Sequence, residues 1–73
     1  MVEKQNFLLL VGQRIKSVRM SKGINQAQLA SLCDRDKQTI ERIENGKINT
    51  SIYMLNIIAE ALQIEPKDLL DIK

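Results

Sequence analysis

Apolar residues recur every three or four positions along most of this chain, which is the spacing of amphipathic helices. The pattern predicts five helices, at residues 7–21, 26–33, 37–45, 52–62 and 66–72. No segment alternates apolar and polar residues, so we expect no β-sheet. The predicted fold class is therefore all-α: a compact five-helix domain at residues 7–73, preceded by a flexible N-terminal arm at residues 1–6.

Short polar residues mark where these helices should begin. Asn6 is expected to cap the first helix and Asn25 the second, because their side chains can accept a free backbone N–H of the first turn. The core stripe of the fourth helix is predicted to begin at Ile52. Only a tight turn through Asp34 and Arg35 separates the second and third helices, so these two helices should form a helix-turn-helix.

The third predicted helix has one polar face and one apolar face. Ile40 and Ile43 share the apolar side, and helical spacing gathers the polar residues on the other side: Lys37, Gln38, Glu41, Arg42 and Asn45. A polar helix on an apolar platform fits the DNA major groove, where arginine can pair with guanine and glutamine with adenine. A solvated surface helix has the same pattern, so the residues alone leave both interpretations open.

The distribution of charge favours a polyanionic partner over one part of the surface. The formal net charge is only +2. Residues 1–50 hold nine basic and five acidic side chains, however, whereas residues 51–73 hold two basic and four acidic ones. This asymmetry fits a nucleic-acid-binding side, although chance can also produce it on a small surface. Phe7 and Tyr53 are the only aromatic residues, which argues against a binder that stacks single-stranded bases.

Several classes of function are disfavoured by what the chain does not contain. It has one cysteine, Cys33, and no histidine, so an internal disulfide and a Cys/His zinc site are excluded. Cys33 is expected to be a buried, inert thiol, with redox sensing as the alternative. With no glycine-rich phosphate loop or paired carboxylates, we expect no enzyme, cofactor, metal or small-molecule ligand. The apolar run at residues 7–11 is too short for a signal peptide or membrane span, so the expected compartment is the cytoplasm.

Two segments resemble the XRE/Cro-type helix-turn-helix family, which includes the lambdoid phage repressors. The first combines Gly12-x-Arg14-Ile15 and Arg19 with Gly23-Ile24-Asn25-Gln26-x2-Leu29-Ala30, and the second is Thr39-Ile40-x-Arg42-Ile43-Glu44-Asn45-Gly46-Lys47. The resemblance implies a five-helix domain whose third helix enters the major groove. It also implies a homodimer on a pseudo-palindromic operator in double-stranded DNA. Asp34 stands where the family turn prefers glycine, and aspartate tolerates the left-handed conformation better than most residues.

The resemblance assigns roles to individual positions. Base contacts fall to Lys37, Gln38 and Arg42, and we add Glu41, whose carboxylate can accept from a cytosine amino group. Near phosphates the same carboxylate would be unfavourable, which leaves a protein-binding module as an alternative. Contacts to phosphates are expected from the residues at the start of the second helix and at the end of the third: Asn25, Gln26, Asn45 and Lys47.

Two further sets of residues are expected to be structural. By resemblance, Arg19 and Glu44 should form a partly buried ion pair with two hydrogen bonds. A second apolar stripe on the fourth helix exceeds what a small core needs, and the family commonly dimerises through the fourth and fifth helices. The predicted dimer interface is Tyr53, Ile57, Ile64, Leu69 and Leu70, with a fuller core as the alternative.

The function that these residues support is sequence-specific regulation of transcription, as a repressor or autoregulator. A phage-type repressor, a controller of a restriction–modification operon and an antitoxin that represses its own operon all match the sequence equally. Neither the operator sequence nor the choice between repression and activation can be read from these residues.

Overall fold

The computed structural model describes residues 3–72, and those residues form an all-helical structure without strands. Four α-helices, α1 (Lys4–Ser21), α2 (Gln26–Leu32), α3 (Lys37–Glu44) and α4 (Ile52–Leu62), are followed by a 3₁₀-helix, η1 (Pro66–Leu70). The all-α prediction is confirmed, but the fifth predicted α-helix is wrong. Five residues led by a proline form a tight 3₁₀ turn, which is the usual form of such short helical segments. Within the described residues, every helix is too short or too polar to cross a bilayer.

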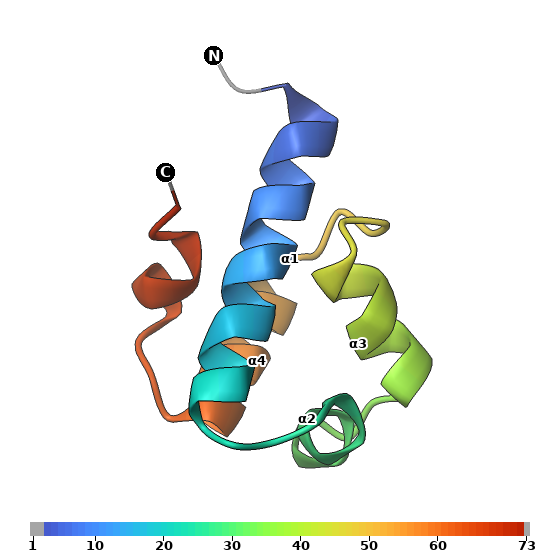
Figure 1. Ribbon diagram of the computed structural model, residues 1–73, viewed down its shortest axis with the longest axis vertical. Helices are drawn as coiled ribbons and strands as arrows, with labels where there is room; N and C mark the ends of the chain where they lie inside the picture. Colours follow the sequence, from blue (N-terminus) through green and yellow to red (C-terminus); the bar gives the residue numbers. More distant parts are fainter. Residues whose placement is uncertain (1–2, 73) are drawn as a thin grey trace.

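The long helix α1 lies at the centre of the molecule and the other elements pack around it (Figure 1). In this view α3 and η1 flank α1 on opposite sides, and α4 lies behind it. The short helix α2 lies near the C-terminal end of α1, where it packs against α3 and α4. The helix-turn-helix pair α2 and α3 is therefore held on one side of a platform made by α1 and α4.

The start of α1 differs from the prediction. The helix begins at Lys4 with Glu3 as its cap, so the predicted cap at Asn6 is wrong and residues 4–6 are helical rather than a flexible arm. The Gln5 side chain donates from Nε2 to the carbonyl oxygen of Gly46 at 3.0 Å, which ties the first turn of α1 to the end of α3. The first two residues of the predicted arm lie outside the described residues.

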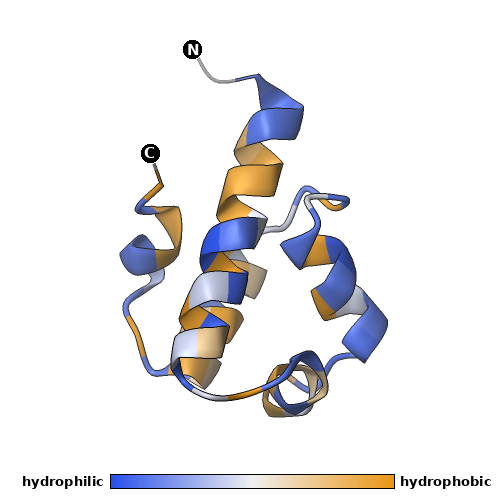
Figure 2. Ribbon diagram, viewed as in Figure 1, coloured by the Kyte–Doolittle hydropathy of each residue, from blue (hydrophilic) through white to orange (hydrophobic). Residues whose placement is uncertain are grey.

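The core gathers one or two large apolar side chains from each element. The fully buried ones are Ile15, Leu29, Ile40, Ile58, Leu62 and Leu69. Ile52, in contrast, is 87% exposed, so its predicted place in the core stripe of α4 is wrong. Ile52 is the first residue of its helix, and the core begins two residues later at Met54. In Figure 2 the apolar segments of α1 alternate with polar ones, as expected for a helix that is packed on some sides only.

The turn between α2 and α3 is closed by backbone bonds and by one side chain. Asp34 adopts the left-handed conformation, with φ at 56°, as its tolerance for that region predicts. The Arg35 guanidinium donates to the carbonyl oxygens of Cys33 and Asp34 at 3.2 and 3.1 Å. Cys33 is 4% exposed. Burial raises the pKa of the Cys33 thiol, which the nearby Arg35 charge opposes, so the thiol remains protonated at neutral pH.

Candidate nucleic-acid interface

The polar face of α3 points away from the core. Lys37, Gln38, Arg42 and Asn45 are exposed and Glu41 is half-buried, whereas Ile40 and Ile43 are buried on the opposite side. The helix lies at the flank of the molecule, beyond which there is no other element (Figure 1). The structure thus places all five predicted polar residues of this helix on one accessible surface.

This surface carries both basic and acidic side chains. The Lys37 ammonium lies 4.0 Å from the Glu41 carboxylate one turn later, and the exposed fractions of the two side chains are 60% and 44%. A pair with this geometry contributes little to stability and is weakened by salt. Arg42 has no ion-pair partner within residues 3–72. Its fork of N–H donors is therefore available to a partner molecule.

A buried ion pair fixes the end of α3 that faces α1. Arg19 donates from Nε to Glu44 Oε2 at 2.7 Å and from Nη2 to Glu44 Oε1 at 3.1 Å. The exposed fractions of the two side chains are 8% and 1%. Arg19 also donates from Nη1 to the carbonyl oxygen of Ile24 at 2.9 Å, in the connection to α2. One side chain of α1 thus holds both helices of the helix-turn-helix.

Gln26 extends this network from α2. Its amide nitrogen Nε2 donates to Glu44 Oε1 at 3.0 Å, so the side chain of the first residue of α2 is fixed against α3. Asn25 and Gln28 form the capping box, in which Gln28 N donates to Asn25 Oδ1 at 2.8 Å and Asn25 N donates to Gln28 Oε1 at 2.7 Å. The side-chain oxygen Oδ1 and the backbone N–H of Asn25 are therefore used by the cap, whereas its side-chain nitrogen Nδ2 makes no hydrogen bond within the described residues.

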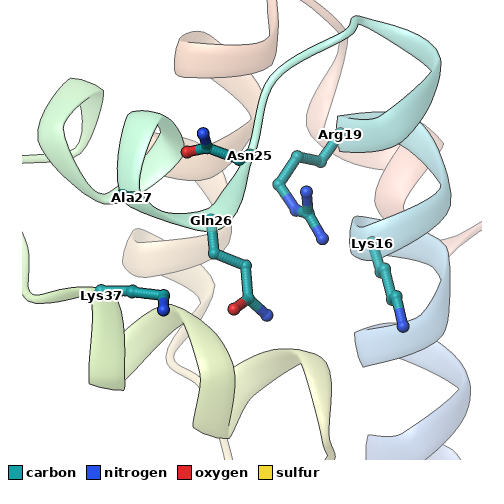
Figure 3. Close-up of a pocket in the computed structure, with 6 residues that line it drawn as sticks. All are labelled: Lys16, Arg19, Asn25, Gln26, Ala27 and Lys37. Carbon is teal, nitrogen blue, oxygen red and sulfur yellow. The ribbon is translucent and has the colours of Figure 1, made fainter.

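The residues expected to contact phosphates lie at the start of α2 and after the end of α3. Asn25 and Gln26, at the start of α2, line a hollow of about 510 Å³ together with Lys37, the first residue of α3 (Figure 3). Asn45 caps the C-terminal end, and Lys47 follows in the loop; both are exposed. This placement gives the exposed face of α3 polar groups at each end.

The hollow also contains a residue that the sequence analysis did not single out. Lys16 of α1 lines it together with Arg19, the residue one turn further along the same helix. In Figure 3 the Lys16 side chain extends from α1 on the side of the hollow opposite α2. The signal was present in the sequence, since positions three apart on a helix share a face, but only the tertiary structure brings α2 and α3 to that face.

A glycine allows α1 and α3 to approach closely. A Cβ atom on Gly12 would lie 2.4 Å from the carbonyl oxygen of Glu44 and 2.5 Å from that of Ile43. Both neighbours are backbone atoms, which a rotamer change cannot remove. Gly12 therefore sets how closely the C-terminal end of α3 packs against α1.

The predicted dimer residues do not form one surface. Tyr53 and Leu70 are 72% and 49% exposed, and they line a groove of about 540 Å³ between α4 and η1. Ile57 and Ile64 are half-buried against the core. Leu69 is 0% exposed, so its predicted place in an interface is wrong: its whole surface is used within the monomer. Ile52, which was expected in the core, lines the groove instead.

Known proteins resemble this chain in sequence and in structure. The HTH_3 family model, described as helix-turn-helix, matches residues 15–69. The control protein C.BamHI of Bacillus amyloliquefaciens is 42% identical over 67 residues, which cover 90% of this chain and 83% of that protein. The immunity repressor protein of Bacillus phage phi105 is 35% identical over 57 residues, which cover 78% of this chain but only 40% of the repressor.

A solved structure also resembles this chain over most of its length. The restriction-modification controller protein C.AhdI from Aeromonas hydrophila superposes with a TM-score of 0.88 at 34% sequence identity, and the match covers 93% of this chain and 99% of that one. The similarity therefore extends over nearly the whole length of both chains.

Proposed function

Since the chain belongs to the HTH_3 helix-turn-helix family of transcriptional regulators, we propose that it binds double-stranded DNA with α3 in the major groove. The observation that carries this proposal is the exposed polar face of α3, with Arg42 in its last turn and without an ion-pair partner among residues 3–72. Arg42 is proposed to read guanine, Gln38 adenine, and Lys37 and Glu41 the neighbouring positions. Asn25, Gln26, Asn45 and Lys47 are proposed to hold the flanking phosphates.

We further propose that the protein is an autoregulator of the controller type. The two controller proteins, C.BamHI and C.AhdI, match this chain over 83% and 99% of their own lengths. The match to the phage repressor covers 40% of that protein. Similarity along almost the whole molecule favours the controller role, and the DNA upstream of the protein's own gene is then the first operator to examine.

Arg42→Ala and Gln38→Ala should each weaken binding to the upstream duplex by about 1–3 kcal/mol and relax base preference. Gln26→Ala should weaken all duplexes alike, because a phosphate contact carries no sequence information. Fluorescence anisotropy with the upstream duplex and a scrambled duplex, over a salt series, measures both effects.

Arg42→Lys is the matched control for the reading of guanine. It keeps the positive charge but loses the planar fork that pairs with guanine O6 and N7. It should bind scrambled DNA as the native protein does and discriminate less well. If all four variants changed specific and scrambled binding equally, the assignment of the reading residues would be wrong. If the native protein bound neither duplex at low salt, the protein-interaction alternative would replace the DNA-binding one.

The groove between α4 and η1 is proposed to be the interface of a homodimer. Ile52, Tyr53 and Leu70 are exposed apolar side chains on one small surface, and such clusters on a small domain mark interaction sites. A second copy of the chain would bury them by two-fold symmetry, as in most soluble oligomers. Two recognition helices would then face successive turns of a pseudo-palindromic operator.

Ile52→Asp should convert the dimer to a monomer without unfolding it, because Ile52 contributes nothing to the core. Analytical ultracentrifugation should show twice the chain mass of 8.3 kDa for the native protein and the single chain mass for the variant. Leu32→Asp is the control, since Leu32 is 61% exposed on α2, away from the groove, and its replacement should leave the mass unchanged. A native protein that sediments as a monomer at high concentration would refute the dimer.

A further inference from the structure

The hollow between α1, α2 and α3 is lined almost entirely by polar and basic side chains. Its residues are Lys16, Arg19, Asn25, Gln26, Ala27 and Lys37, and its volume is about 510 Å³ (Figure 3). No carboxylate is among them. A concave surface lined by cations attracts anions, because its walls concentrate the field of charges of one sign.

The three cations of the hollow differ in whether a neighbouring carboxylate already neutralises their charge. Arg19 is bound by the Glu44 carboxylate through two hydrogen bonds, and Lys37 has the Glu41 carboxylate at 4.0 Å. Lys16 takes part in no ion pair within the part of the chain that the structure describes. Its helix, α1, contains four basic residues and no acidic one, and the Glu44 carboxylate of the neighbouring α3 is already bound by Arg19 and Gln26. Lys16 is thus the cation in the hollow whose charge is not neutralised.

Gln26 supplies a second group with spare capacity. A side-chain amide carries two N–H donors. One of the two in Gln26 points to Glu44 Oε1 at 3.0 Å, and that bond fixes the direction of the other. The amide is held by the protein before any ligand arrives, so binding would require little further ordering.

We propose that this hollow binds a backbone phosphate of the DNA duplex, and that Lys16 of α1 neutralises it. This inference rests on the proposed function, since the duplex reaches the hollow only when α3 lies in the groove. It extends the DNA-binding surface beyond the helix-turn-helix to α1. The contact is with the phosphodiester and not with a base edge, so it adds affinity without adding sequence preference.

Lys16→Gln tests the proposal. It should weaken binding to the upstream and scrambled duplexes by the same factor, about three- to tenfold at low salt, and should reduce the slope of log K against log salt by about one. Lys16→Arg should restore both, because it keeps the charge. Lys22→Gln is the matched control: it removes the same charge from an exposed lysine at the end of α1 that lines a different hollow, and it should leave the slope unchanged.

The outcomes separate this proposal from the function on which it rests. If Lys16→Gln binds and responds to salt as the native protein does, while Arg42→Ala still loses discrimination, the phosphate site is refuted and the DNA-binding function stands. Equal losses for Lys16→Gln and Lys22→Gln would show a general charge effect and would also refute the site. A native protein that binds no duplex would refute both. The melting temperatures of the three lysine variants should equal that of the native protein. Unfolding is then excluded as the cause of weakened DNA binding.

Discussion

Arg19→Met should lower the free energy of unfolding by about 3–5 kcal/mol, the largest loss that we expect from any single substitution outside the apolar core. The substitution removes a charge and leaves the Glu44 carboxylate, 1% exposed, with Gln26 as its remaining partner. It also leaves the carbonyl oxygen of Ile24 without its 2.9 Å bond. Stranding a buried charge costs more than the pair itself contributes, because water cannot reach it.

A domain of 73 residues has roughly 4–11 kcal/mol of stability in total, so this loss is a large fraction of what holds the domain folded. Urea denaturation followed by circular dichroism measures the loss as a shift in midpoint. Glu44→Gln, which keeps the shape of the side chain, should lose less and stay folded. The double variant Arg19→Met/Glu44→Leu should recover part of the loss, because neither charge is then left alone.

Arg14→Met is the matched control for this pair. Arg14 lies on the same helix and donates from Nε to the carbonyl oxygen of Asp68 at 2.8 Å, but it has no carboxylate partner among residues 3–72. Its loss should be only about 1.5 kcal/mol, the contribution of one hydrogen bond from a charged group. A loss under 1 kcal/mol for Arg19→Met, or equal losses for the two arginines, would contradict a buried pair that fixes the helix-turn-helix.

Features that depend on neighbouring positions could be read from the sequence. The capping box of Asn25 and Gln28 involves residues three apart, and the left-handed turn at Asp34 depends on the conformational range of one residue. The two faces of α3 follow from helical spacing alone. For each of these the pattern determines the geometry because the interacting groups are close along the chain.

Features that depend on where the core ends in three dimensions could not be predicted from the sequence. Helical spacing places Ile52 in line with Leu55, but it does not say that the helix begins beyond the edge of the core. Leu69 and Leu70 are neighbours, and which of them points inward depends on the 3₁₀ geometry of η1, which periodicity at 3.6 residues per turn does not describe. The start of α1 at Lys4 depends on a bond between Gln5 and a residue beyond the end of α3.

In the candidate site, too, some features were predictable from the sequence and others depend on the tertiary structure. The polar face of α3 was visible in the sequence, whereas the hollow with Lys16 exists only because three helices meet. The roles of these residues at DNA remain predictions that the proposed binding measurements test.

Gly12→Ala should destabilise the protein by about 2–3 kcal/mol, although alanine is the better helix former. In an exposed helix the change would be favourable by about 1 kcal/mol. Here the added Cβ would lie 2.4 Å from the carbonyl oxygen of Glu44 and 2.5 Å from that of Ile43, distances that real Cβ atoms essentially never show. Relief requires α1 and α3 to move apart as whole helices. The free-energy cost of the clash therefore exceeds the gain in helix propensity, and the substitution destabilises the protein instead of stabilising it.

Two other alanine substitutions serve as controls, one for helix propensity and one for backbone strain. Ser17→Ala, on the exposed surface of α1, measures the propensity term alone and should stabilise slightly. Gly23→Ala measures backbone strain alone, because φ there is +74° and, apart from Gly23 and its two chain neighbours, no described residue has an atom within 4 Å of the added Cβ. It should lose about 1 kcal/mol. Urea denaturation of all three variants isolates the steric contribution at Gly12.

Moving α3 away from α1 should also affect recognition. The clash falls on the last residues of α3, beside the Arg19–Glu44 pair that fixes the tilt of this helix. At a temperature where Gly12→Ala remains folded, its binding to the upstream duplex should weaken more than its binding to scrambled DNA, because base contacts require closer placement than phosphate contacts do. Full stability together with native discrimination would show that the spacing between α1 and α3 can adjust. The close packing at Gly12 would then not position the recognition helix.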